Sequence, residues 1–503
     1  MKKRLRYTGV LFVLLFGLTL SVIVLGGSSD FYLKEQLTKP LLSHQVMALC
    51  AIALVALLKR LPKYNHLDES LKKHGGRLLI AASFLLFLVH VLVCYHGYFM
   101  GNGDDVFYVL NSAVSYGRNY KEGLETRYLE LYPNNLTLVF LYGLVVRGLK
   151  VIGGLEPGIE RIRIFLILIQ SMENILCGVL IARMVRKRTG NELSAFIAWL
   201  MYLLLIGLSP WYLVPYSDST ILIFPLLLCE LCDRNWTVKW IKYVIIGVLG
   251  GIVYLIKPQG FIPVISCIIL EIARAFREKK GKPIFNAFLV SVFAFLVIFP
   301  GFSFIVREMN MDIDPQERVG MTHYLNMGLN NKTDGCFSPE DVAVDRSYKP
   351  QSVRDKYCLE SAKNRLVQMG PSGLIRHLFR KTLVNYWDGS FSWNLDFDMQ
   401  WKEEKDAIIT PVIREWLSQN SFTRRVSATA ATTIWILVLL MSLNPRKGRW
   451  EQMELSCIGM WMFNILFEAK GRYVYIFIPV LIVLAAQSLT IRFSPKATDL
   501  KDV

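Results

Sequence analysis

Two adjacent carboxylates have the residue type and the position to do chemistry. Asp104 and Asp105 follow Gly101-Asn102-Gly103, directly after a long apolar run. A carboxylate held at a membrane surface can act as a general base or a metal ligand, because partial burial and neighbouring charges tune its pKa. The alternative is that one of the two caps a helix that begins near Val106, which is an ordinary use of Asp at a helix start. The local sequence leaves both interpretations open.

Two basic residues stand at the ends of other apolar runs. Lys257 precedes Pro258, which breaks the chain between two such runs, and Arg472 precedes Tyr473 at the start of the last run. Two cations at one interface suit a phosphate or pyrophosphate group, which the planar guanidinium of Arg can bind through two hydrogen bonds. Each cation alone is more typical of a side chain that extends to lipid headgroups. The two cations together therefore indicate a phosphate-binding site more strongly than either one does alone.

Polar and aromatic residues mark two further junctions. Tyr132 begins the stretch YPNN, and Tyr216 and Asp218 lie in the stretch PYSDS at the start of another apolar run.

A hard divalent cation prefers about six oxygen ligands, so the two carboxylates of Asp104 and Asp105 alone are a weak metal site. The sequence therefore predicts no resident cofactor, with a divalent metal at this pair as the remaining option.

The elements that must position these residues are membrane-spanning helices. The chain has 503 residues, of which 53% are hydrophobic and only 19% are charged, whereas soluble domains carry about 25% charged residues. Apolar runs of roughly 18 residues or more predict spanning helices. The fold class is therefore an all-α polytopic membrane protein of about a dozen spans. These are predicted at residues 7–26, 41–58, 78–99, 161–182, 193–208, 217–232, 241–256, 259–274, 284–305, 427–443, 454–467 and 473–491.

The basic clusters predict the orientation. A net charge of +17 could suggest nucleic acid, but an excess of Lys and Arg in cytoplasmic loops explains it in a membrane protein, and no nucleic-acid partner is expected. The compact clusters at 183–188, 279–282 and 446–449 fall on one side if both termini are cytoplasmic. Residues 136–146 are apolar but short, and are predicted to be re-entrant or interfacial. The junctions described above then all lie on the extracytoplasmic face.

Two large polar segments face outward in this topology. The predicted organisation is an N-terminal two-helix extension at 1–77, a membrane core at 78–306 with an outer loop at 101–160, an extracytoplasmic loop domain at 307–426, C-terminal spans at 427–491 and a cytoplasmic tail at 492–503. Within the loop domain, Gly370-Pro371 predicts a break between two helices. Cys336 and Cys358 lie in the same domain, where a disulfide between them would persist, and the sequence leaves that pairing open.

The order of these motifs resembles the GT-C class of integral-membrane glycosyltransferases. The chain is most similar to the Gram-positive bacterial subgroup and, more distantly, to protein O-mannosyltransferases and aminoarabinose transferases. The resemblance covers most of residues 78–491 and departs at Cys336, where relatives often carry Gly. It is carried by Asp104-Asp105, by YPNN, by PYSDS, by Lys257-Pro258, by the loop residues His323–Asn330 and Ser338–Asp341, and by Gly471-Arg472-Tyr473.

The resemblance implies transfer of a sugar from a polyprenyl-phosphate donor at the outer face of the cell membrane. The acceptor would be an envelope glycan, a glycolipid or a teichoic-acid-like polymer, and the reaction would be inverting. Asp104 or Asp105 would be the general base, and Lys257 and Arg472 would bind the donor phosphate. The expected substrate-binding residues are Tyr132, Tyr216, Asp218, His323, Asn326, Asn330 and Tyr473.

Two other functions remain compatible with the sequence. A transporter or flippase of a lipid-linked glycan would use the same bilayer location, although such proteins typically show paired halves and broken midplane helices, which are not evident here. A non-catalytic partner in envelope glycan assembly would tolerate the loss of both Asp104 and Asp105.

Overall fold

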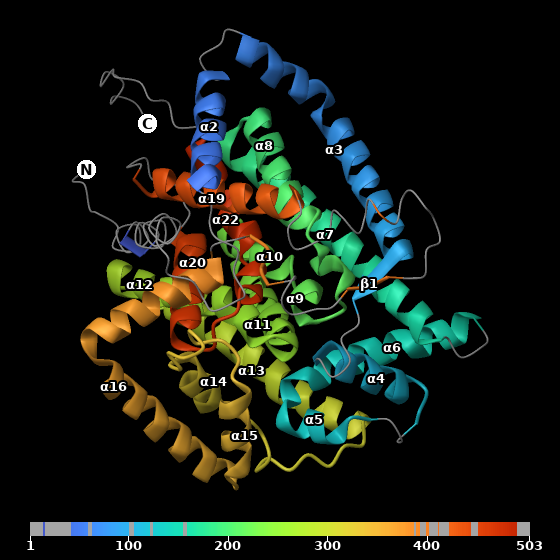
Figure 1. The fold of residues 1–503 in the computed structure, drawn as a ribbon. Coiled ribbons are helices and arrows are strands. Elements are labelled where there is room, and N and C mark those ends of the chain that lie inside the picture. The colour runs from blue at the N-terminus through green and yellow to red at the C-terminus, as the bar shows by residue number, and fades with distance from the viewer. Residues whose placement is uncertain are drawn as a thin grey trace.

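The structure is a computed structural model of the full chain. It describes residues 14–15, 42–58, 63–99, 105–120, 124–153, 158–386, 389–392, 399–401, 411, 422–443 and 451–489, to which all structural statements refer (Figure 1). The predicted tail at 492–503, and the predicted first span apart from Leu14 and Leu15, lie outside these residues.

The described chain is almost entirely helical, and six of its helical segments are long and apolar enough to cross a membrane. These are His66–His96, Pro133–Gly153, Ile159–Thr189, Lys239–Ile256, Pro258–Glu278 and Lys282–Glu308. They correspond to α3 (Lys63–His96), η1 (Pro133–Asn135) with α6 (Leu136–Gly153), α7 (Ile159–Thr189), α11 (Lys239–Ile256), η4 (Pro258–Phe261) with α12 (Ile262–Glu278), and α13 (Lys282–Glu308). A polytopic helical membrane protein is therefore the coarse architecture.

Other predicted spans appear as shorter or broken helices. The predicted span at 217–232 is divided into α9 (Ser217–Thr220) and α10 (Phe224–Asp233). The last predicted span is divided into α21 (Arg472–Tyr475) and α22 (Ile478–Ser488). The remaining elements here are α2 (Leu42–Leu58), α8 (Glu192–Tyr202), η2 (Leu203–Gly207), η3 (Pro210–Leu213), α19 (Phe422–Leu443) and α20 (Glu451–Leu466). The total of about a dozen spans stays a prediction.

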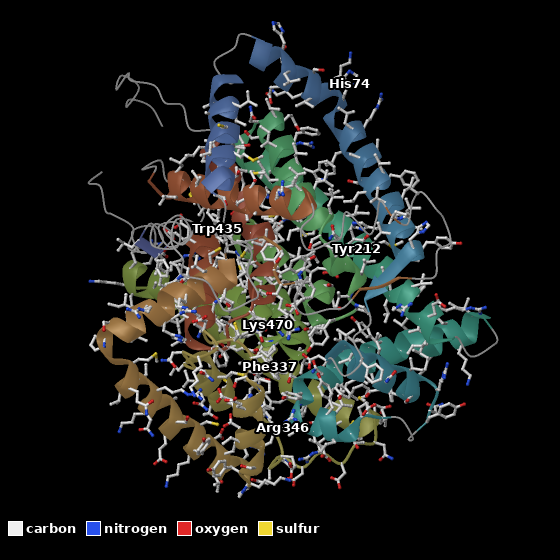
Figure 2. The ribbon with its side chains drawn as sticks, viewed as in Figure 1. His74, Tyr212, Phe337, Arg346, Trp435 and Lys470 are labelled. Atoms are coloured by element: carbon white, nitrogen blue, oxygen red, sulfur yellow. The ribbon has the colours of Figure 1, made fainter. Side chains whose placement is uncertain are left out.

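The loop domain packs three helices over one end of the bundle. These are α14 (Met321–Gly328), α15 (Pro339–Ser347) and α16 (Gln351–Tyr386). The predicted break in α16 is confirmed, because Gly370 has φ 59° and ψ −179° and the helix bends there (Figure 1). Figure 2 places Arg346 at the lower edge of this domain and Phe337 between Arg346 and Lys470. A short antiparallel ribbon pairs β1 (Gly97–Phe99) with β2 (Met399–Trp401).

The cysteines of the loop domain are not bonded to each other. None of the nine cysteines, all of which lie among the described residues, forms a disulfide. The disulfide that the sequence left open is therefore not present in this structure. Cys358 is buried on α16, whereas Cys336 is half-buried at the cavity described below.

The prediction of a short segment at 136–146 is wrong in length. The helix α6 continues through Arg147 and Lys150 to Gly153. Arg147 lies within the helix, where its guanidinium is 4.2 Å from the ring centre of Tyr116 and donates to Asn119 Oδ1 at 3.2 Å. The α6 helix packs closely beside α4 (Asp105–Gly117), as Figure 1 shows at lower right.

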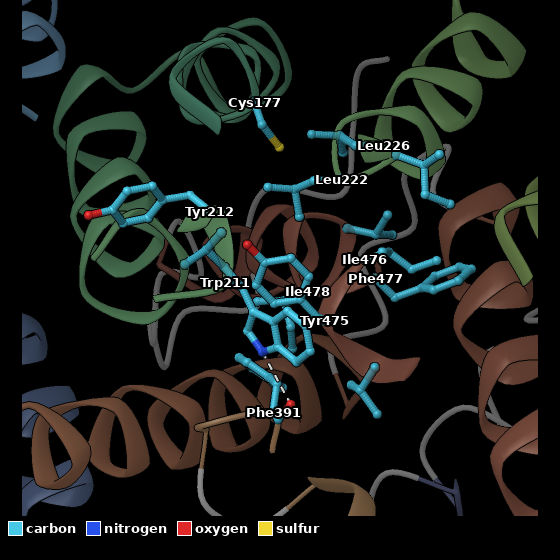
Figure 3. Close-up of a cluster of buried hydrophobic side chains, with 14 of the residues drawn as sticks. Cys177, Trp211, Tyr212, Leu222, Leu226, Phe391, Tyr475, Ile476, Phe477 and Ile478 are labelled. Carbon is cyan, nitrogen blue, oxygen red and sulfur yellow. Dashed lines mark hydrogen bonds between the residues drawn. The ribbon is translucent and has the colours of Figure 1, made fainter. Parts of the chain in front are cut away.

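The centre of the bundle is α22, which is buried on every side. Residues 475–486 expose almost no surface, as expected for a helix that is apolar all round. The helix packs against α7, α8 and α19. Figure 3 shows Tyr475 beside Trp211, whose indole nitrogen donates to the carbonyl of Phe391 at 3.2 Å. Arg472, the first residue of α21, is therefore followed directly by residues buried in the core.

Candidate active site

Most of the predicted site residues line one cavity of about 830 Å³. It lies between the start of α4, the α5 (Thr126–Leu131) to η1 junction, the α11–η4 junction, α14 and the segment before α21. The predicted residues on its wall are Asp105, Tyr132, Tyr216, Lys257, His323, Arg472 and Tyr473. Asp218, Asn326 and Asn330 do not line it, and Asp104 is outside the described residues.

Asp105 is the first residue of α4, and both of its oxygens have partners. The hydroxyl of Tyr128 donates to Oδ1 at 2.8 Å, and the hydroxyl of Tyr216 donates to Oδ2 at 3.2 Å. Arg472 Nη2 lies 3.4 Å from Oδ2. The side chain keeps 38% of its surface exposed, so an incoming group can reach it.

These neighbours decide the ionisation of Asp105. Burial by itself raises the pKa of this carboxyl group, but the charges of Arg472 and Lys470 and the two tyrosine hydrogen bonds outweigh it. The pKa of Asp105 is therefore lowered, and the group is a carboxylate at neutral pH. The same environment raises the pKa of Tyr128 and Tyr216 well above that of a free phenol, chiefly through burial, so both hydroxyls stay protonated donors.

Arg472 is held by backbone contacts around it and by aromatic rings. Its guanidinium lies 5.4 Å from the ring centre of Tyr216 and 5.7 Å from that of Tyr473, in cation–π geometry. The backbone amides of the three residues before Arg472 all donate hydrogen bonds to residues of the loop domain. The amide of Ala469 donates to the carbonyl of Gly335 at 2.7 Å, that of Lys470 to Asn385 Oδ1 at 2.9 Å, and that of Gly471 to Ser392 Oγ at 3.2 Å.

Lys257 forms a buried pair with Asp218. The Lys257 Nζ lies 2.7 Å from Asp218 Oδ1, and the aspartate has no exposed surface. Burial lowers the pKa of Lys257, which Asp218 partly opposes and Arg472 reinforces. The ammonium also lies 5.2 Å from the ring centre of Tyr473. In this structure Asp218 therefore holds Lys257, and its role in binding a sugar stays a prediction.

The loop residues divide into one on the cavity wall and two behind it. His323 lines the cavity, and its Nδ1 contacts the buried carboxylate of Asp345. Asn330 Nδ2 donates to Asp341 Oδ2 at 3.0 Å, and the Asp341 carboxylate receives two bonds from Arg365 at 2.6 and 3.0 Å. Asn326 accepts from Arg365 through its backbone carbonyl at 2.6 Å. Substrate contacts by Asn326 and Asn330 stay predictions.

A family described as "conserved hypothetical integral membrane protein" has a model that matches residues 1–492. The chain belongs to this family. Neither the curated proteins nor the solved structures gave a match. Membership establishes an integral membrane protein and agrees with the several apolar helices of the fold. The chemistry must therefore be argued from the cavity itself.

The sequence alone did not identify Tyr128 and Glu468 as members of the site. Tyr128 lies four residues before Tyr132, and this helical spacing brings both rings to one side, with centroids 5.2 Å apart. Glu468 accepts the hydroxyl of Tyr473 at 2.8 Å and lines the cavity. The i, i+4 spacing could have indicated Tyr128, whereas the contact of Glu468 depends on how the segment between α20 and α21 folds.

The side chains that the structure describes around Asp105 do not fit a divalent metal. Among the described residues, no group of three or more His, Cys, Asp or Glu side chains is arranged to hold a metal ion. The charged groups that act on the Asp105 carboxylate are the cations Arg472 and Lys470. A divalent cation there would face like charges and only one described carboxylate.

Proposed function

We propose that the protein is a glycosyltransferase that moves a sugar from a polyprenyl-phosphate donor to an envelope acceptor at the outer membrane face. The observation that supports this most is the contact between Asp105 and Arg472 inside a large cavity at the ends of apolar helices. A base for a hydroxyl and a cation for a phosphate are the two groups that such a transfer needs.

The walls of the cavity suit the two parts of the donor. Arg472 and Lys257 supply positive charge for the phosphate. Apolar side chains from membrane helices and their ends line another part, among them Tyr254 on α11 and Phe463 on α20. A polyprenyl tail in the bilayer can lie against such side chains while the headgroup enters the cavity.

The reaction then has one displacement step. The acceptor hydroxyl attacks the anomeric carbon, its proton goes to the Asp105 carboxylate, and the bond from the anomeric carbon to the phosphate oxygen breaks. The electron pair of that bond leaves with the lipid phosphate, whose increased charge Arg472 and Lys257 stabilise. Attack opposite to the leaving group inverts the anomeric carbon, through an oxocarbenium-like transition state.

The Asp105–Arg472 contact links donor binding to base strength. A donor phosphate competes with Asp105 for the guanidinium, and at 3.4 Å their contact is longer than a tight ion pair. When Arg472 turns toward the phosphate, the charge that lowers the pKa of Asp105 is partly neutralised. Asp105 therefore becomes a stronger base once the donor is bound.

The experiment is a transfer assay with a radiolabelled polyprenyl-phosphate sugar in inverted and right-side-out membrane vesicles. We expect label to move from the lipid into an acid-stable envelope fraction, and only when donor is available at the extracytoplasmic face. Membranes without the protein are the control. Label that crosses the bilayer but stays on the lipid would instead support the transporter, and no movement of either kind would support the assembly partner.

A further inference from the structure

Two cations of the cavity are not needed by the donor phosphate. Arg318 lies just before α14 and Lys332 shortly after it, and both are exposed side chains on the cavity wall. Lys257 and Arg472, by contrast, are buried deeper and paired with Asp218 and Asp105. A donor with one phosphate uses the inner pair, which leaves the outer pair available to another ligand.

The acids nearest to this outer pair in sequence are already occupied by other cations. Glu317, next to Arg318, binds Arg127 at 2.8 Å and also contacts Lys349. Asp334, close to Lys332, binds Arg380 at 2.7 Å. Within the part of the chain that the structure describes, neither Arg318 nor Lys332 forms an ion pair.

A third cation extends this positive surface outward. Arg346 on α15 is exposed, and it donates to the hydroxyl of Tyr132 on the cavity wall at 3.0 Å. In Figure 2 it stands at the outer edge of the loop domain, with Phe337 between it and Lys470. Because Lys470 also lines the cavity, basic residues occur both at its exposed side and beside Asp105.

We infer that the acceptor is a polyanionic polymer with phosphodiester or similar anionic groups in its repeats, held at the cavity mouth by Arg318 and Lys332. The inference rests on the proposed function, because the bound polymer is an acceptor only if the protein transfers a sugar. Repeated anions suit cations placed at intervals, because one group is bound at the mouth while the next repeat presents its hydroxyl to Asp105. A neutral protein or sugar acceptor would gain nothing from the outer pair.

The test is a binding measurement without donor, on the full chain in phosphatidylcholine nanodiscs. The probes are fluorescent oligomers of poly(glycerol phosphate) and uncharged dextran of equal length. Two exposed contacts worth up to about 1 kcal/mol each correspond to at most roughly thirtyfold in affinity, and reversing both charges adds repulsion. We therefore expect Arg318→Glu with Lys332→Glu to raise the Kd for the phosphate polymer at least about tenfold. The milder pair Arg318→Gln with Lys332→Gln should weaken binding less, and added salt should weaken wild-type binding.

The matched control is Lys356→Glu with Lys363→Glu on α16. It makes the same change in net charge at exposed residues that do not line the cavity, so it should leave the Kd unchanged. Equal loss in the control pair, equal binding of dextran, or no change in either outer-pair variant would overturn the inference. The inference would also be overturned if the outer-pair variants differed from wild type only in nanodiscs that contain phosphatidylglycerol. The outer pair would then bind lipid headgroups and not the polymer.

A separate transfer assay distinguishes this inference from the proposed function. If the polymer binds as expected but no sugar is transferred from donor, the polyanion site stands and the transferase proposal fails. If sugar is transferred and the outer-pair variants transfer it to the same polymer as well as wild type does, the transferase proposal stands and the inference fails.

Discussion

At the scale of single residues, the site depends on one carboxylate and the groups that keep it charged. Asp105 receives two tyrosine hydroxyls and faces a guanidinium that contacts the rings of Tyr216 and Tyr473. A base that stays ionised at neutral pH can accept a proton in every turnover. In the proposed mechanism, its strength depends on whether Arg472 is turned toward it or toward the donor phosphate.

Replacing Arg472 with Gln should move the acid limb of the pH–rate profile to higher pH. Without the guanidinium, burial of Asp105 is opposed by fewer charges, so its pKa rises and protonation inactivates the base at a higher pH as the pH falls. The kcat/KM profile for sugar transfer measures this shift. Arg472→Lys is the control and should shift the limb less. An unchanged limb would show that Arg472 does not set the pKa of the base.

The residue types in the site could be predicted, but several of their partners could not. Charged side chains at the ends of apolar runs are candidates for functional residues, and such positions hold Asp105, Lys257 and Arg472. The pairing of Lys257 with Asp218 joins residues on separate helices, and only the tertiary fold determines it. The same holds for the contact of His323 with Asp345.

At the scale of elements, the segment from Phe467 to Arg472 is held in place by the loop domain. Lys381 of α16 donates to the carbonyls of Gly328 and Ile465, both at 2.8 Å, and so ties the end of α14 to the end of α20. Gly328 itself lies against the backbone of Phe467. Because Arg472 follows shortly afterwards, this packing determines where the guanidinium stands.

A methyl group at Gly328 should displace the segment from Phe467 to Arg472. A Cβ at this position would lie 2.6 Å from the carbonyl carbon and oxygen of Phe467, which is too close for any real contact. We expect Gly328→Ala to lower thermal stability by an amount typical of overpacking, about 1–3 kcal/mol, and to reduce transfer more than donor binding. Gly148→Ala in α6 is the control, because its Cβ would meet nothing within 4 Å. Equal activity in the two variants would contradict the positioning role.

The buried amine of Lys381 should make stability depend on pH. Burial lowers the pKa of Lys381 to about 7, with Cys336 and Glu468 opposing the shift. Between that value and the ordinary pKa of about 10.4, the unfolded chain binds more protons than the folded one, so stability rises with pH. The change in Tm from pH 7 to 10 should be smaller in Lys381→Met than in wild type. A larger or equal rise in the variant would contradict the assignment.

Helix breaks were easier to predict than helix lengths. Gly370-Pro371 and Lys257-Pro258 carry local signals, and both breaks are present in the structure. The apolar segment predicted at 136–146 stops before Arg147, whereas α6 continues to Gly153. Arg147 contacts Tyr116 and Asn119, and α6 packs on α4.

At the scale of the whole molecule, the fold places the site at one end of a helical bundle. The buried α22 helix forms the centre, and the cavity lies where α21 leads into it. The sequence predicted this general organisation from apolar runs and basic clusters. It could not fix the number of spans, because several apolar helices are short or broken and acquire their burial only from their neighbours.

The orientation can be measured by cysteine labelling in intact cells. Lys332→Cys at the cavity mouth should react with a membrane-impermeant maleimide from outside, whereas Lys187→Cys at the end of α7 should react only after permeabilisation. Both side chains are exposed in the structure. The unsubstituted chain supplies the background, since Cys50 is also exposed. The opposite pattern of labelling would place the cavity in the cytoplasm.

The most direct test of the central claim compares Asp105→Asn with wild type in the sugar-transfer assay at matched expression. Asn keeps the size of the side chain and removes its capacity to accept a proton. We expect transfer to fall by about 10²–10⁴-fold while the protein stays folded and still binds the donor. Asp104→Asn, measured in parallel, shows whether the neighbouring carboxylate shares the role. Transfer at the wild-type rate in Asp105→Asn would contradict the assignment of Asp105 as the base.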